Sequence, residues 1–550
     1  MTTNRRKWLL AAGATAAGAA GGLVWWRRTR EERTMPPERA AQPALPPLPL
    51  DPDFPNPLAR PGTDGINGIL DVGGMLTIVA KPVRHALEPG KSASLLGFEV
   101  EHLGKRYINP LLRIRSGGQF RARFWNALED PSIIHWHGLK LDSNNDGHPH
   151  YAVAGGATYD YQFTVTNRAA TYWYHPHPHH HTGRQVYLGL TGLFVVEDAE
   201  ELALGEALDL SLGATDIPLI IQDRTLDKNG QIRFAPEDGE RFDGYRGAAV
   251  LVNGTPRPYL DTATRILRFR ILNGSNARMY RVAFRQGENL VAFQVIGTDG
   301  GLLPGPQSAQ EVFLSPSERV DVLLDLRAAR RGDTVTLSSL AFDPMEHESH
   351  AGAPAPEHTG HHANAAPAPA KVAIPAEGDA MDLMKIRVTT ENTYDRTIPR
   401  TLARFMADDG TLARPRLITL DVKGGRWRIN GRTYEQRETP IVVKRDTREL
   451  WDINNAKRSM PHPFHIHGFQ FKVISRKGSP EQQSRLAVTP AGLSCTDLGW
   501  KDTVLTWPGE TVRIAIDFTH PYPGDQVYMV HCHNLEHEDG GMMVNMKVAS

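Results

Sequence analysis

Three stretches of this 550-residue chain share one outline, in which two short strands flank an asparagine-containing turn. They are residues 111–138, 263–282 and 441–468. A further strand-like stretch follows each copy in the same order, at residues 154–165, 315–326 and 507–518. Short β-branched and aromatic runs separated by Gly, Pro, Asn and Asp turns are typical of β-sandwiches. The repeat therefore predicts an all-β chain with three related domains.

The predicted domains span residues 65–203, 204–342 and 385–550, close to the usual domain size. Residues 343–384, between the second and third domains, are low in complexity and rich in Ala, Pro and His. Such a composition cannot form a packed core, so we expect a mobile insert. Its five histidines either collect metal ions or belong to a plain solvated linker.

The N-terminal residues 1–34 contain Arg5 and Arg6 ahead of a mildly apolar run. This resembles a twin-arginine export signal, which predicts an exported protein of the periplasm or cell envelope. The alternative is a membrane anchor, because residues 8–26 are long enough to span a bilayer. Membrane contact is therefore expected only through an uncleaved N-terminal segment. The proline-rich residues 35–64 are expected to form a stiff extended spacer.

Charge and cysteine content exclude several classes of protein. Lys plus Arg equals Asp plus Glu, at 62 each, so no nucleic-acid partner is expected. The two cysteines, Cys495 and Cys532, allow at most one disulfide, so disulfides do not hold this fold together. The unusual feature is the presence of 23 histidines, most of them clustered.

Histidines of the first and third repeats occur in His-x-His pairs, whereas the matching stretch of the second repeat has none. The pairs are His135/His137, His175/His177, His465/His467 and His531/His533. Residues i and i+2 of a strand face the same side, so each pair directs two imidazoles to one place. Eight imidazoles exceed the ligands of one transition metal, which predicts a multinuclear centre between the first and third domains.

Cys532 lies between two of these histidines and should face the opposite side of its strand. There it can meet His462 and His537, with Met542 as a weak axial ligand. Two histidines, a thiolate and a distant methionine form the blue-copper arrangement that is suited to electron transfer. A closed structural zinc site would not need a second histidine cluster one residue away.

Four motifs carry a resemblance to a known family. "HWHG", "YHPH", "HPFHIHG" and "HCHNLEHEDGGMM" resemble the copper-binding motifs of the multicopper oxidases, which include laccases, bilirubin oxidases and bacterial cuprous oxidases. "TGRQV" and "GWKDTV" resemble the bacterial branch. The resemblance implies three cupredoxin-like Greek-key β-sandwich domains. It also implies four copper ions, of which one is type 1, one is type 2 and two are type 3.

The same resemblance assigns each copper ligand. The type 1 ligands are His462, Cys532, His537 and Met542; the type 2 ligands are His135 and His465; the type 3 ligands are His137, His175, His177, His467, His531 and His533. It implies that substrate gives single electrons to the type 1 copper and that they pass through Cys532 to the three-copper centre. Dioxygen is reduced there to water, and copper carries the redox chemistry.

Two carboxylates resemble positions that the family uses for proton delivery or for support of copper ligands. They are Asp146, on the turn after "HWHG", and Glu538, directly after His537. The alternative for each is an ordinary surface carboxylate.

The resemblance leaves the reducing substrate open. Met460 matches a methionine of cuprous oxidases, but Arg458 stands where those enzymes have an acid. We therefore predict a laccase-like enzyme with dioxygen and phenols or aromatic amines as partners, with Cu(I) oxidation in copper tolerance as the alternative. A remote alternative is a non-enzymatic exported protein of the same fold, or a copper-storage protein.

Three further histidines, His179, His180 and His181, extend the second motif. They either support copper ligands, load copper or form an exposed loop.

Overall fold

Hydrophobic alternation determines which sheets face water. Strand β8 (Gln119–Asn126) alternates exposed and buried residues along its whole length, with Phe120, Ala122 and Phe124 inside. This is the pattern of a sheet with one face on the core and one in solvent. By contrast, β9 (Ile134–His137) and β11 (Ala170–Pro176) are buried on both faces. The strands that contain His135, His137 and His175 are therefore interior strands, and His177 directly follows β11.

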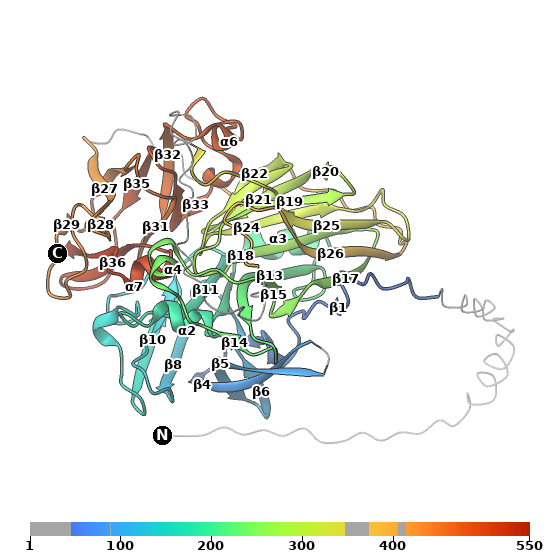
Figure 1. Cartoon of the computed structure of the whole chain (residues 1–550), viewed down its shortest axis with the longest axis horizontal. Coiled ribbons are helices and arrows are strands. Elements are labelled where there is room, and N and C mark those ends of the chain that lie inside the picture. The colour runs from blue at the N-terminus through green and yellow to red at the C-terminus, as the bar shows by residue number, and fades with distance from the viewer. Residues whose placement is uncertain (1–45, 89, 347–372, 405–413) are drawn as a thin grey trace, which may run out of the picture. The chain divides into compact units, whose positions relative to one another are not determined.

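The computed structural model describes residues 46–88, 90–346, 373–404 and 414–550. By its internal contacts the chain divides into a unit Met1–Pro49 and a unit Leu50–Ser550. Of the first unit only residues 46–49 are described, without regular secondary structure. The described part of the second unit contains six sheets, which form three β-sandwiches, so the all-β prediction is confirmed (Figure 1). We refer to these sandwiches as the first, middle and third domains.

The first domain packs a six-stranded sheet on a five-stranded sheet. The six-stranded sheet runs β10 (Thr158–Thr164), β8, β4 (Met75–Glu88), β5 (Lys91–His102), β6 (Lys105–Ile108) and β2 (Gly65–Ile66). The five-stranded sheet runs β3 (Ile69–Asp71), β7 (Leu111–Arg115), β12 (Gly192–Glu197), β11 and β9. Its short helices are η1 (Pro149–Tyr151), α2 (Thr182–Tyr187) and α3 (Ala199–Ala207). An aromatic cluster that includes Phe120, Trp136 and Phe194 fills the space between the sheets.

The middle domain has a seven-stranded and an eight-stranded sheet. The first runs β1 (Asn56–Pro57), β17 (Pro258–Ala263), β26 (Met381–Thr390), β25 (Thr334–Ser339), β19 (Tyr280–Gln286) and β20 (Asn289–Val291), and β23 (Glu311–Leu314) also pairs with β19. The second runs β16 (Thr255–Pro256), β15 (Ala249–Val252), β13 (Asp216–Leu226), β18 (Ile266–Asn273), β24 (Arg319–Asp325), β21 (Phe293–Thr298) and β22 (Gly301–Ala309), and β14 (Ile232–Arg233) also pairs with β13. Helix α4 (Asp238–Asp243) lies in the connection between β14 and β15.

The third domain again packs six strands on five. The six-stranded sheet runs β28 (Arg426–Ile429), β27 (Arg416–Lys423), β30 (Arg448–Asn455), β35 (Thr511–Asp517), β32 (Phe471–Lys477) and β33 (Trp500–Lys501). The five-stranded sheet runs β29 (Ile441–Lys444), β37 (Met543–Ala549), β36 (Gln526–Cys532), β31 (His462–Ile466) and β34 (Thr503–Thr506). Its short helices are α6 (Glu481–Ser484), η2 (Cys495–Asp497) and α7 (Leu535–Asp539). Strands β31 and β36 are neighbours; they contain His465 and His531 of the other two histidine pairs, and His467 and His533 directly follow them.

Two segments beyond the predicted limits complete the middle domain. Strand β26 pairs with β17 and β25, so the predicted start of the third domain at residue 385 falls inside a strand of the middle domain. Strand β1, in the predicted spacer 35–64, pairs with β17, and Phe54 and Leu58 beside it are buried. The physical reason is that β17 needs hydrogen-bond partners on both sides and that these apolar side chains gain from burial.

The predicted signal, residues 1–34, and most of the predicted insert, residues 347–372, lie outside the described residues. Among the helices of the described ranges, none is both long and apolar enough to cross a membrane.

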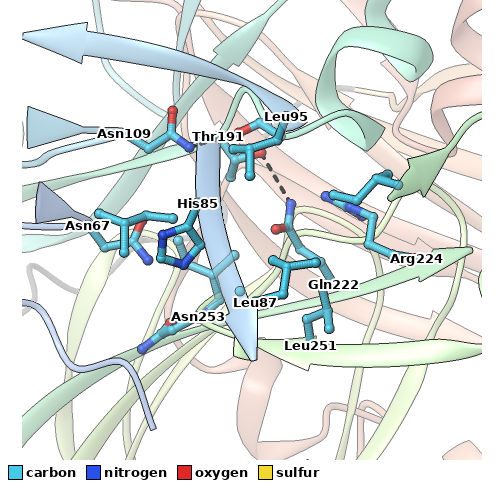
Figure 2. Close-up of a pocket in the computed structure, with 15 residues that line it drawn as sticks. Asn67, His85, Leu87, Leu95, Asn109, Thr191, Gln222, Arg224, Leu251 and Asn253 are labelled. Carbon is cyan, nitrogen blue, oxygen red and sulfur yellow. Dashed lines mark hydrogen bonds between the residues drawn. The ribbon is translucent and has the colours of Figure 1, made fainter. Parts of the chain in front are cut away.

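A small cavity lies between strands of the first and middle domains (Figure 2). His85, Gln222, Arg224 and Asn253 are among its lining residues, and Gln222 donates a hydrogen bond across it to Thr191. Its volume of about 40 Å³ has room for ordered water but not for an aromatic substrate. The lining contains none of the predicted copper ligands.

Candidate metal centre

The four His-x-His pairs meet at one buried place between the first and third domains. In the first domain, β9 and β11 are antiparallel neighbours, with His135 opposite His175. In the third, β31 and β36 are antiparallel neighbours, with His465 opposite His531. All eight side chains of the pairs are at most 1% exposed. The structure thus brings together the imidazoles of two domains that are far apart in the chain.

Within this cluster the ring nitrogens converge in groups of three. The groups are His137/His175/His533, His177/His467/His531 and His135/His137/His465. In the second group, Nε2 of His531 lies 3.0 Å from Nε2 of His467 and 3.4 Å from Nε2 of His177. Nitrogens that bind one metal ion at about 2 Å are spaced like this. The first two groups contain the six predicted type 3 ligands, and the third contains both predicted type 2 ligands.

Several imidazoles offer a nitrogen that has no other partner. Nε2 of His135, His175 and His465 and Nδ1 of His137 are buried without a hydrogen-bond partner. Buried polar atoms are nearly always paired, so these four atoms point to a ligand. The other nitrogen of each of these rings contacts a protein oxygen. Nδ1 contacts a backbone carbonyl in three of them: that of Asp146 for His135 at 2.6 Å, that of Pro176 for His175 at 2.9 Å and that of Asp502 for His465 at 2.8 Å. In His137, Nε2 contacts the Asp502 carboxylate at 2.9 Å.

These contacts fix the tautomers and leave one lone pair on each ring for a metal. Burial also keeps the rings neutral. It lowers the pKa of His175 to about 3 and that of His177 to about 4, and in both cases burial is the largest cause. Neutral imidazole is the form that binds transition metals, so this donor set fits copper.

A second buried site lies around Cys532. Its Sγ is 3.4 Å from Nδ1 of His462 and 3.6 Å from Nδ1 of His537. Met542 is fully buried, and its carbonyl accepts a hydrogen bond from the Cys532 backbone N–H. Burial raises the pKa of the Cys532 thiol, so a bound metal ion is needed to make it a thiolate at neutral pH. Cys532 thus lies with His462 and His537, while its neighbours His531 and His533 belong to the histidine cluster.

The outer nitrogens of the two histidines beside Cys532 are also occupied. Nε2 of His462 lies 3.0 Å from the hydroxyl of Ser459, and Nε2 of His537 lies 2.9 Å from the carbonyl of Phe242. His462 and His537 are 0% and 1% exposed, so solvent does not reach their imidazole edges.

An aromatic pair covers this site. The Trp427 ring lies 5.0 Å from the His462 ring and 4.9 Å from the His537 ring. Its indole N–H donates to the Phe242 carbonyl at 2.8 Å, and the two aromatic rings stack at 4.7 Å. Phe242 lies on α4 of the middle domain, and Trp427 lies on β28 of the third. Sequence reasoning missed both residues, because no motif or spacing links α4 with β28.

The two predicted carboxylates are both buried at the histidine cluster, so neither is a surface carboxylate. Asp146 Oδ2 is 2.7 Å from Nδ1 of His467, and burial raises the pKa of Asp146 well above its usual value. Glu538 Oε2 is 3.2 Å from Nδ1 of His531, and its Oε1 is 3.5 Å from Nε2 of His177. Burial acts to raise the Glu538 pKa, but these two histidines outweigh it and hold the pKa at about 2.

The remaining predicted residues lie elsewhere. Cys495 and Cys532 are both buried free thiols, so the cysteines form no disulfide. Within the described residues, none of the three-ligand groups includes His179, His180 or His181. Arg458 is exposed, and Met460 is half-buried against the core of the third domain. The insert histidines lie outside the described residues.

In this chain of three β-sandwiches, Cys532 lies one residue away from two members of the histidine cluster. A thiolate site this close to a multinuclear site is typical of a copper protein that passes electrons from the first site to the second. Family models described as "Multicopper oxidase" match residues 95–201 and 410–550. The chain is 30% identical to the multicopper oxidase mco of Staphylococcus aureus, over 86% of this chain and 88% of that protein. It is also 30% identical to a laccase of Bacillus subtilis, over 76% of this chain and 80% of that protein.

The crystal structure of the McoA multicopper oxidase from Aquifex aeolicus is similar over 90% of this chain and 99% of that chain, with 38% identity and a TM-score of 0.77. The chain belongs to the multicopper oxidase family. It is therefore an oxygen-reducing oxidoreductase with type 1, type 2 and type 3 copper sites, and the alternative of a non-enzymatic protein is wrong.

Proposed function

We propose that this enzyme is laccase-like and oxidises phenols and aromatic amines with dioxygen as the electron acceptor. The observation that carries the proposal is the cover of the Cys532 site. The hydroxyl of Ser459, not a carboxylate, contacts Nε2 of His462, and the Trp427 ring packs against the rings of His462 and His537 and stacks on Phe242. Apolar aromatic cover favours a flat organic reductant, because such surfaces bind aromatic rings by stacking. The similarity to the Bacillus subtilis laccase supports this choice.

We assign His462, Cys532, His537 and Met542 to type 1 copper and the three imidazole groups to the type 2 and type 3 coppers. Copper supplies one-electron oxidation of the substrate and four-electron reduction of dioxygen. The polypeptide links the two sites by the shortest route available, since Cys532 is the direct chain neighbour of His531 and His533.

The proposal places both buried carboxylates on the proton path to the oxygen site. Asp146 orients His467 with its carboxylate and His135 with its carbonyl. Glu538 lies between His177 and His531, and both of its carboxylate oxygens are buried without a hydrogen-bond partner. Because its pKa is held at about 2, the Glu538 carboxylate is ionised at neutral pH and can act as a proton acceptor beside the oxygen site.

A second candidate substrate is Cu(I), and two observations favour it. Met460 packs against the core of the third domain, which includes Cys532 and Met542, and thioethers are ligands for Cu(I). Helix α4, which covers this site through Phe242, carries Asp238, Glu240 and Asp243 among its six residues. A negative rim attracts cations, which includes protonated aromatic amines as well as Cu(I).

Oxygen uptake with a methoxyphenol, an aromatic amine and Cu(I), each taken as kcat/KM, tests the proposal. We expect the organic reductants to exceed Cu(I). We expect Arg458→Asp, which places an acid near Met460, to raise the Cu(I) value alone, and Lys457→Asp to serve as the matched charge control. A wild-type preference for Cu(I) would reject the laccase-like assignment.

Export through the segment 1–34 is also part of the proposal. Fractionation of cells that express the full chain, with and without Arg5 and Arg6, tests it.

A further inference from the structure

Two consecutive residues of the third domain hold two imidazoles of the histidine cluster. The carboxylate Oδ1 of Asp502 lies 2.9 Å from Nε2 of His137, and the Asp502 carbonyl lies 2.8 Å from Nδ1 of His465. The hydroxyl of Thr503 lies 3.2 Å from the same nitrogen of His465 and 3.4 Å from Nε2 of His137. The position of residues 502 and 503 therefore determines how both rings are turned.

The contact with Asp502 gives His137 a different metal-binding atom from its neighbours. An ionised carboxylate only accepts hydrogen bonds, so Nε2 of His137 carries the proton and Nδ1 is left for the metal. Nδ1 of His137 is indeed the buried atom without a partner, whereas in His135, His175 and His465 that atom is Nε2. The orientation of His137 thus depends on the Asp502 carboxylate.

Asp502 is itself held by the middle domain, which contributes no residue to the metal-binding groups of the described chain. Arg319, on β24, donates from Nη1 to Oδ1 of Asp502 at 2.8 Å and from Nη2 to Oδ2 at 2.5 Å. It also donates from Nε to the Thr171 carbonyl of the first domain at 3.0 Å. Arg319 is 1% exposed and bonds to all three domains. A bidentate guanidinium–carboxylate pair fixes both the distance between the two groups and their relative orientation, whereas a lysine fixes only the distance.

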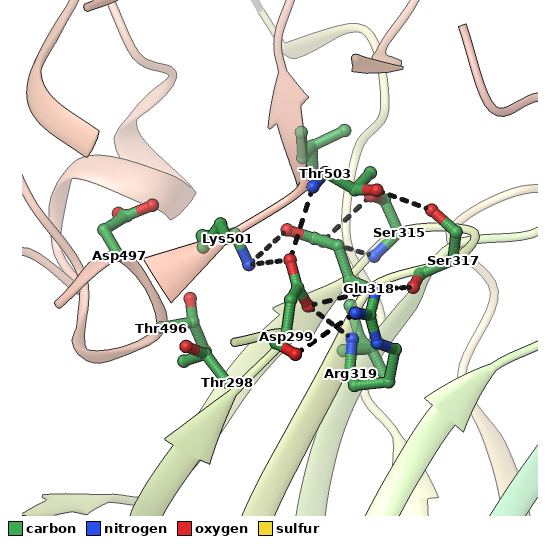
Figure 3. A network of polar contacts seen from close by, with 12 residues as sticks. Thr298, Asp299, Ser315, Ser317, Glu318, Arg319, Thr496, Asp497, Lys501 and Thr503 are labelled. Carbon is green, nitrogen blue, oxygen red and sulfur yellow. Dashed lines mark hydrogen bonds and ion pairs between the residues drawn. The ribbon is translucent and has the colours of Figure 1, made fainter. Parts of the chain in front are cut away.

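Further bonds hold this arrangement in place (Figure 3). Ser317 donates from its hydroxyl to Thr503 at 2.9 Å, and the Arg319 backbone N–H donates to Asp299 at 2.8 Å. Lys501 lies between Asp299 and Glu318, at 3.2 Å and 3.1 Å.

The arrangement also leaves no free space beside His137. A Cβ atom added to Gly138, which has φ +86°, would lie 2.4 Å from Oδ2 of Asp502 and 3.0 Å from Nη2 of Arg319. Tight packing of this kind transmits a displacement of Arg319 or Asp502 directly to the neighbouring histidine.

We propose that Arg319 of the middle domain is a positioning residue for the three-copper centre. It holds the Asp502 carboxylate so that His137 presents Nδ1 to copper, and with Ser317 it holds Thr503 against His465. The middle domain thereby acts on dioxygen reduction although it supplies no copper ligand.

The test is Arg319→Lys in the full-length holoenzyme, with Arg268→Lys as the matched control. Arg268 is an equally buried arginine of the middle domain that pairs with Glu201 and Asp321 instead of Asp502. The measurements are copper retained per chain during dialysis against a chelator, the type 2 spin-resonance spectrum and the visible copper–thiolate absorption. Loss of a residue that supports a metal ligand weakens metal affinity by about 10-fold to 100-fold.

In Arg319→Lys we expect at least tenfold weaker retention of the three cluster coppers and an altered type 2 spectrum, with unchanged copper–thiolate absorption. If Arg319→Lys does not fold, as judged by circular dichroism, Asp502→Asn must show the same selective loss. Retention and type 2 spectrum equal to wild type would overturn the proposal, as would an equal loss in Arg268→Lys.

Discussion

The backbone carbonyl of Phe242 lies 2.9 Å from Nε2 of His537. Phe242 belongs to the middle domain and His537 to the third, so the cover of the Cys532 site is a contact between domains. Arg319 of the middle domain donates to Asp502, whose carboxylate contacts His137 of the histidine cluster. The domain without copper ligands thus contacts the Cys532 site directly and the histidine cluster through Asp502.

Trp427→Ala should open the Cys532 site to large substrates. The indole ring lies over both His462 and His537, and its removal exposes their edges. We expect the ratio of kcat/KM for a bulky phenol to that for a small one to rise about tenfold, which corresponds to about 1.4 kcal/mol in transition-state binding. Truncation of a buried tryptophan should also lower the free energy of unfolding by about 3–5 kcal/mol. An unchanged ratio in folded protein would show that Trp427 does not restrict access.

Cys532→Ser should separate the two copper sites. Without the thiolate, the visible copper–thiolate absorption disappears and the protein binds one copper fewer per chain, because a hydroxyl is a poor ligand for this site. The histidine cluster should keep its type 2 spin-resonance signal. Metal analysis together with both spectra checks this. A variant that loses all copper would mean that the cluster cannot form alone.

Asp146→Asn should slow dioxygen reduction and leave the visible absorption intact. The amide keeps the size of the side chain and can still accept from His467 Nδ1, but it cannot carry a proton. Positioned acid–base groups contribute about 100-fold to 10,000-fold in rate, so we expect kcat to fall by about 100-fold. Stopped-flow reoxidation of the reduced enzyme measures the step directly. Full turnover in this variant would remove Asp146 from the proton path.

Glu377→Gln should change the pH dependence of stability. Burial raises the Glu377 pKa from 4.5 to about 7, although Arg246 and Arg278 act to lower it. Because the folded-state pKa is raised, the native protein loses stability as pH rises from 4.5 through about 7. The variant lacks this loss, so it should match wild type near pH 4 and be more stable at pH 8, by up to about 3 kcal/mol.

Denaturant unfolding at the two pH values, with the exposed substitution Glu288→Gln as control, measures the difference. Equal stability of variant and wild type at pH 8 would contradict the raised pKa.

The sequence predicted those site residues whose side-chain directions follow from the local geometry of a strand. A period of two along a strand is enough to pair His135 with His137 and to turn Cys532 away from His531 and His533. Resemblance in the motifs then located Asp146 and Glu538. It could not locate the limits of the middle domain, because β1 and β26 join that domain by pairing with strands that are distant in the chain.

By itself the sequence determined the three-domain β fold, the metal and the set of imidazoles, because repeats, strand alternation and ligand chemistry are local properties of the chain. Only the tertiary structure decided how those imidazoles are oriented and covered. The contacts of Asp502 with His137, of Arg319 with Asp502 and of Phe242 with His537 join residues that are 365, 183 and 295 positions apart. Such contacts depend on how the domains pack against one another, which no local pattern records.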